Sequence, residues 1–160
     1  MRTRNTLAKE TASLGDPVVS GSGATDLSEK ALRESVDHDP QNFAANHRMG
    51  ELLLDSGRAS EAILYLQRAS AADPGDYRNS YDLARANAAA GNYERAREEI
   101  HGLTESHDKA ELHHLSGDVE EKLGDPLEAV RQYQRAAELE PTEPYLFDWG
   151  AELLLHHVWI

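Results

Sequence analysis

The chain has 160 residues, a formal net charge of −13 at pH 7 and no cysteine. This length suffices for one domain with its own core, and the absence of cysteine excludes disulfides, thiolate zinc sites and a cysteine nucleophile. The excess of carboxylates disfavours binding to nucleic acid, because phosphate contacts need clustered Lys and Arg.

Residues 1–26 mix Thr, Ser, Gly and Asp without periodic apolar positions. Such a segment buries too little surface to offset its ordering entropy, so we predict a flexible tail. Near Arg2, Arg4 and Lys9 the longest apolar run is Val18-Val19, which gives no signal-peptide core, and no later stretch reaches the roughly 20 apolar residues of a membrane span. We therefore expect a cytoplasmic protein, although a chain whose leader had been removed would have the same sequence.

Residues 27–42 are predicted to form a partial helical unit. The run Asp26-Leu-Ser-Glu29 has the pattern of a helix start, and Ala31, Leu32 and Val36 follow at helical spacing. Pro40 closes the segment. We interpret it as the second helix of an incomplete repeat.

From residue 43 onward the sequence repeats with a period of about 34 residues, the sign of a stacked repeat architecture. The recurring positions are Gly57, Gly91 and Gly124, then Ala62, Ala96 and Ala129, then Ala69, Leu103 and Ala136, with Pro40, Pro74 and Pro141 between units. The predicted units are 43–76, 77–109 and 110–143, followed by an unfinished unit at 144–160.

Each unit is predicted to contain two helices. In the first, Ala44 to Asp55 and Ser60 to Ala72 flank the turn Ser56-Gly57-Arg58, and Asp73-Pro74 ends the second helix. Glycine supplies the left-handed backbone of a tight turn, and proline stops a helix because it lacks an N–H group.

This pattern resembles the tetratricopeptide repeat, over roughly Leu27 to Trp159. The family's eighth, twentieth and twenty-seventh positions are Gly50, Ala62 and Ala69, then Ala84, Ala96 and Leu103, then Gly117, Ala129 and Ala136. The second unit departs from the pattern by being one residue short and by carrying Asp108 in place of the proline, so we expect its second helix to end between residues 101 and 106. In the third unit Ser116 replaces a large apolar residue, whose role we expect Leu115 to take. The resemblance implies an all-α solenoid of antiparallel helix pairs.

The C-terminal segment Glu143 to His157 resembles the first helix of a fourth unit. Residues 153–155 at its end and residues 158–160 after it are apolar. The terminal repeats of such arrays usually present a polar face instead. The run is similar to bacterial tetratricopeptide proteins, and we expect either a fragment of a longer array or a surface for self-association.

The resemblance implies that the first helix of each unit lines a concave groove that binds a partner protein or peptide without catalysis. The candidate partner-binding residues are His47, Glu51, Asp55, Arg78, Tyr81, Arg85, Glu111, His114, Asp118 and Lys122. Leu54, Ala88 and Glu121 share these positions, and Tyr145, Asp148 and Glu152 would extend them. Carboxylates slightly outnumber cations, so a peptide with basic and apolar residues suits this face. The alternative is that these side chains form an ordinary solvated helix surface.

Some members of the family hold a chaperone's terminal carboxylate with Lys and Asn on the first helices. Here His47 and Glu51 occupy the corresponding positions of the first unit, and Asp82 replaces a second Asn. Carboxylate capture at this place would meet repulsion.

Two His–carboxylate pairs stand at helical spacing, His47 with Glu51 and His114 with Asp118, a pattern that metal or acid–base sites also show. The pairs lie on helices too far apart to share an ion, and each alone supplies too few ligands. We predict hydrogen-bonded pairs four residues apart on a solvated face. No catalytic residue, metal site or cofactor is predicted.

Overall fold

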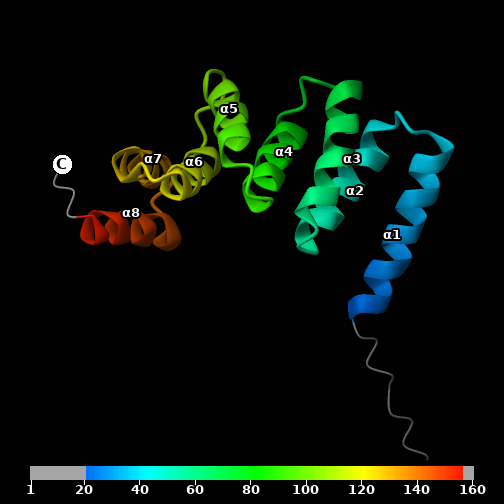
Figure 1. The fold of residues 1–160 in the computed structure, drawn as a ribbon, viewed down its shortest axis with the longest axis horizontal. Coiled ribbons are helices and arrows are strands. Elements are labelled where there is room, and N and C mark those ends of the chain that lie inside the picture. Colours follow the sequence, from blue (N-terminus) through cyan, green and yellow to red (C-terminus); the bar gives the residue numbers. More distant parts are fainter. Residues whose placement is uncertain (1–20, 157–160) are drawn as a thin grey trace, which may run out of the picture.

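The computed structural model describes residues 21–156, with side chains from Ser28 onward. Over this range the chain forms eight helices and no strand (Figure 1). The helices are α1 (Gly21–His38), α2 (Phe43–Asp55), α3 (Ala59–Ala72), α4 (Tyr77–Ala89), α5 (Tyr93–Thr104), α6 (Ala110–Leu123), α7 (Pro126–Leu139) and α8 (Glu143–Leu155). The predicted all-α repeat fold is therefore confirmed.

Helix α1 begins at Gly21, whereas the sequence predicted a flexible tail up to residue 26. Once residues 27–38 are helical, each further residue adds a hydrogen bond at little nucleation cost, which composition alone does not reveal. The part of the predicted tail at 1–20 lies outside the described residues.

The helices follow one another in an arch from α1 to α8 (Figure 1). Successive helices pack as hairpins, and α2 also contacts α4, as α4 contacts α6. We call α2, α4, α6 and α8 the inner helices and α1, α3, α5 and α7 the outer helices. Among the described residues no helix is both long and apolar enough to cross a membrane.

Local sequence signals explain where the helices begin and turn. Side chains of Asn42, Asp76 and Asp125 precede α2, α4 and α7 and accept hydrogen bonds from backbone N–H groups of the first turn. The predicted turn glycines, Gly57, Gly91 and Gly124, have φ values of 74°, 83° and 81°. Their left-handed backbone confirms the role predicted for them.

The small residues of the repeat are the places where helices touch. Ala62, Ala96 and Ala129 are all 0% exposed. Around them lie hydrophobic clusters, one containing Met49, Leu53, Ala62, Leu66, Leu83 and Ala86 and another containing Ala84, Ala96, Ile100, Leu112, Leu115 and Val119. Leu115 therefore has the core role predicted for it.

The irregular second unit closes without its proline. Helix α5 ends at Thr104, inside the predicted window. Asp108, which replaces the proline, accepts a hydrogen bond from Arg135 of α7 and lies 2.9 Å from Nε2 of His113. This carboxylate ties the connection before α6 to the third repeat.

Candidate partner-binding groove

A hollow of about 540 Å³ runs along the inner helices, and we call it the groove. Its lining residues are Leu54 of α2, Arg85, Ala88 and Ala89 of α4, Tyr93 of α5, and Leu115, Asp118, Val119, Glu121 and Lys122 of α6. Six of the residues predicted to face the groove line it: Leu54, Arg85, Ala88, Asp118, Glu121 and Lys122. The groove combines an apolar floor with charges of both signs.

Beside the groove, the fully buried carboxylate of Asp82 in α4 gathers three other side chains. Arg85 Nη1 donates to its Oδ1 at 2.9 Å, and Arg78 Nε lies 3.6 Å from its Oδ2. His47 of α2 places Nε2 3.1 Å from the same Oδ2. The four residues form a compact polar cluster that joins two inner helices.

Asp82 is not among the predicted binding residues, and the sequence indicates only that it replaces an Asn of the family. A signal was present in the sequence, since Arg78 and Arg85 stand four residues before and three after it on one helix. A carboxylate between two arginines at that spacing indicates a paired acid. Its link to His47, 35 residues earlier, depends on the packing of α2 against α4.

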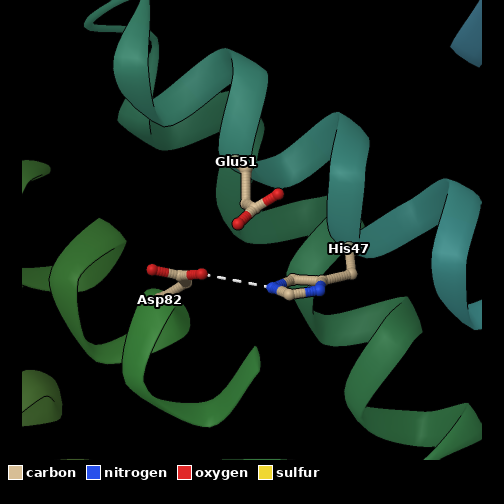
Figure 2. A group of neighbouring side chains, drawn as sticks. All are labelled: His47, Glu51 and Asp82. Atoms are coloured by element: carbon tan, nitrogen blue, oxygen red, sulfur yellow. Dashed lines mark hydrogen bonds and ion pairs between the residues drawn. The ribbon is translucent and has the colours of Figure 1, made fainter. Parts of the chain in front are cut away.

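The hydrogen bonds predicted within each His–carboxylate pair do not form as expected. His47 faces Asp82 (Figure 2). Glu51 instead accepts a hydrogen bond from Arg48 at 3.0 Å. His114 Nε2 lies 2.7 Å from Asp148 Oδ2 of α8, and its Nδ1 is 3.7 Å from Asp118. Both rings reach the next inner helix, because the repeats pack close enough for an imidazole to span them.

Tyr81, one of the predicted binding residues, belongs to an aromatic cluster on α4. Its ring stacks on Tyr77 with a centroid separation of 6.1 Å, and Arg85 lies 5.9 Å from its centroid. Burial raises the pKa of Tyr81 to about 12. Tyr77 donates a hydrogen bond from its hydroxyl to Glu111 at 3.0 Å. The predicted binding residue Glu111 of α6 is therefore held by a contact with α4.

The carboxylate of Asp118 is held from the outer helix α7. Tyr133 donates its hydroxyl to Asp118 Oδ1 at 2.7 Å. Partial burial raises the pKa of Asp118 even though this hydrogen bond opposes the shift. Tyr145 of α8 lies 5.0 Å from the His114 ring, which continues the polar surface toward the last inner helix.

The remaining predicted residues differ in exposure. Asp55, at the end of α2, and Lys122, near the end of α6, are exposed. Glu152 of α8, predicted to extend the groove, is only 4% exposed. It lies 3.2 Å from His156, and burial raises its pKa. A partner in the groove therefore cannot reach it.

One group of side chains has ligand atoms suited to a metal ion. His47, Glu51 and Asp82 can each present one ligand atom so that all three atoms lie within 4.8 Å of one another. The sequence spacing indicates only the pair on α2, and the third ligand comes from the next repeat. Figure 2 shows the three side chains projecting into one gap between α2 and α4.

Three sequence profiles that match the chain belong to one family. Sequence profiles described as tetratricopeptide repeat match residues 21–77, 53–118 and 110–143. No curated protein matches the chain.

Solved structures share the fold at low identity. A crystal structure of MamA is 19% identical, covers 86% of this chain and 81% of its own, and has a TM-score of 0.77. MamA from Desulfovibrio magneticus RS-1 is 16% identical, and the match covers 86% of this chain and 78% of the MamA chain with a TM-score of 0.77. YrrB, described as a TPR protein with an unusual peptide-binding site, is 18% identical. The match covers 80% of this chain and 67% of the YrrB chain with a TM-score of 0.65.

Proposed function

The chain belongs to the tetratricopeptide repeat family and is a protein–protein interaction module, and we propose that it binds a partner polypeptide in the groove between α2, α4 and α6. Members of this family are typically non-catalytic scaffolds. We propose the same for this chain, which would bind its partner without catalysing a reaction.

The observation that supports this proposal most strongly is the composition of the groove. Three inner helices contribute to it, so an extended peptide lying across them contacts successive repeats. Leu54, Ala88 and Ala89 offer apolar surface, while Arg85 and Lys122 offer hydrogen-bond donors. Apolar surface with a few fixed polar groups is typical of specific binding sites.

Charge favours a partner with basic residues. Arg85, one of the two cations that line the groove, is paired with buried Asp82. Asp118 and Glu121 then outnumber Lys122 along the groove, and the whole chain carries −13. We therefore propose a peptide with basic and apolar side chains, drawn to the groove by complementary charge.

Filling the groove tests the proposal. A peptide is selected from a random library against the wild-type chain, and its affinity is measured by calorimetry for Ala88→Arg and Ala71→Arg. Ala88 lines the groove, whereas Ala71 is an exposed residue of the outer helix α3. Ala88→Arg should weaken binding by at least about tenfold, and Ala71→Arg should leave it unchanged. Equal affinities for both variants would remove the groove from the account.

A second candidate function is self-association through α8. Leu146, Phe147, Leu154 and Leu155 are 45%, 72%, 77% and 69% exposed. Large contiguous apolar surface often marks an interaction site. A second copy that covered this helix would bury it.

Sedimentation velocity over a range of protein concentrations tests this candidate. If the face self-associates, Leu154→Glu should shift the chain toward monomer. Leu64→Glu, the same change at an exposed leucine of the outer helix α3, should not. A wild-type chain that stays monomeric throughout the range contradicts self-association.

A further inference from the structure

Beyond peptide binding, a cluster on α2 and α4 has the chemistry of a cation site. His47, Glu51 and Asp82 supply one imidazole and two carboxylates whose ligand atoms all lie within 4.8 Å of one another. We propose that these three residues bind a divalent transition-metal ion of the zinc class. Imidazole with carboxylate suits such ions, whereas Mg²⁺ and Ca²⁺ prefer oxygen ligands alone.

The distance between the first two ligand atoms is close to that of a zinc site. His47 Nε2 lies 3.1 Å from Asp82 Oδ2. Zinc bonds of about 2.0–2.2 Å in tetrahedral geometry place two ligand atoms roughly 3.3–3.6 Å apart. The ion therefore fits between these two atoms once they separate by a few tenths of an ångström.

The third ligand comes from the same helix face as the first. Glu51 follows His47 by four residues, one turn along α2, and Figure 2 shows both side chains on the side that faces Asp82. Glu51 is paired with Arg48, whose side chain is 71% exposed. Such a surface pair contributes little, so Glu51 can turn toward an ion at low cost.

The arginines around Asp82 act in opposite ways. Arg85 donates to Oδ1 and leaves Oδ2 for the ion, as an outer-shell partner that orients a ligand does. Arg78 lies 3.6 Å from Oδ2 itself and is 57% exposed, so it competes with the ion and must swing into solvent. The site is therefore expected to be weaker than a closed structural zinc site, and weaker with Arg78 than without it.

A second cluster in the same chain lacks this geometry and provides a control. Asp148 lies 2.7 Å from Nε2 of His114, and Asp118 lies 3.7 Å from Nδ1. The two carboxylates face opposite ring nitrogens, so an ion on either nitrogen meets only one of them. Convergence on one point distinguishes the His47 cluster.

Three protein ligands leave one position of a tetrahedral ion open to water or to a donor from a partner. Arg85 connects Asp82 to the groove, which it also lines. An ion here would add a fixed positive charge beside a surface rich in carboxylates. The proposal does not depend on peptide binding, because the ion needs only residues of this chain.

Titration of the 160-residue chain with Zn²⁺ alone, followed by calorimetry, tests the site in the absence of any peptide. His47→Ala should lower the zinc affinity by at least about tenfold. Glu51→Gln should also lower the zinc affinity, and this substitution removes no buried side chain. Arg78→Ala should tighten it, because the competing cation is gone. His114→Ala should leave it unchanged, and Mg²⁺ should give no comparable binding.

Far-ultraviolet circular dichroism of each variant confirms that helicity is retained. Zinc affinity that is equal in the wild type, His47→Ala and Glu51→Gln, or that falls with His114→Ala instead, overturns the proposal and assigns the ion to histidines elsewhere. If His47→Ala does not fold, Glu51→Gln and Arg78→Ala decide alone, through the opposite changes expected of them.

Discussion

Two glycines of the inner helices lie against outer helices with no room for a β-carbon. A Cβ at Gly117 would lie 2.6 Å from Cε1 of Tyr133, and one at Gly50 would lie 2.5 Å from Cγ of Leu66. Gly150 has the same place in the fourth unit, yet a Cβ there meets no atom within 4 Å. The repeat position is thus under steric demand only where an outer helix covers it.

This contrast gives a matched stability test. Gly117→Ala and Gly150→Ala gain the same helix propensity, but only the first forces a buried ring to move. Relative to Gly150→Ala, we expect Gly117→Ala to lose about 1–3 kcal/mol in the free energy of unfolding. Denaturant unfolding of both variants measures the difference, and equal stabilities would show that Tyr133 yields freely.

Two aspartates are expected to affect the pH dependence of stability with opposite signs. Burial raises the pKa of Asp118, so its contribution is present at low pH and is lost as pH rises through the folded-state pKa. Arg135, and then His113, lower the pKa of Asp108, so its contribution is present above the unfolded pKa and is lost as pH falls.

Unfolding free energies of the wild type, Asp118→Asn and Asp108→Asn, measured from about pH 3 to pH 7, separate these effects. Relative to Asp118→Asn, the wild type should become less stable as pH rises above about 4. Relative to Asp108→Asn, it should lose its advantage as pH falls below about 4. Parallel curves for all three proteins would contradict both assignments.

At the scale of elements, consecutive inner helices are linked by contacts between side chains 34 or 35 residues apart. His47 faces Asp82, Tyr77 donates to Glu111, and His114 faces Asp148. Each link joins corresponding regions of neighbouring repeats, so the repeat period appears again in the polar contacts. These links fix one inner helix against the next beside the groove.

A double-mutant cycle measures one such link. Tyr77→Phe removes the hydroxyl that donates to Glu111 while keeping the ring that stacks on Tyr81, and Glu111→Gln removes the acceptor's charge. We expect a coupling of about 1 kcal/mol in the free energy of unfolding. Additive effects within experimental error would mean that the contact does not stabilise α4 against α6.

Element bounds could be predicted closely where the turn chemistry is explicit. The helix predicted from Ala44 begins at Phe43, and the one predicted from Ser60 begins at Ala59. Glycine turns and capping residues determine these ends locally. Helix α1 begins at Gly21, before the predicted start at Asp26, because a helix that extends toward its N-terminus leaves no capping signal of its own.

At the scale of the whole molecule, the 34-residue period was sufficient to predict the array, because small residues returning at one spacing require helices to nest there. The resemblance to the tetratricopeptide family, and not the period, predicted that Arg85, Asp118 and Lys122 share one face, and all three line the groove. The cluster around Asp82 could not be predicted, since it depends on how far an imidazole reaches across two packed helices. The same limit applies to Glu152, whose burial follows from its contacts within the folded array.

Backbone amide chemical-shift mapping with a bound peptide shows whether a partner lies across α2, α4 and α6. We expect the largest shift changes on α4 and α6, around Arg85, Ala88, Asp118 and Lys122. Changes concentrated on the outer helices α3, α5 and α7, or on α8 alone, would contradict binding in the groove.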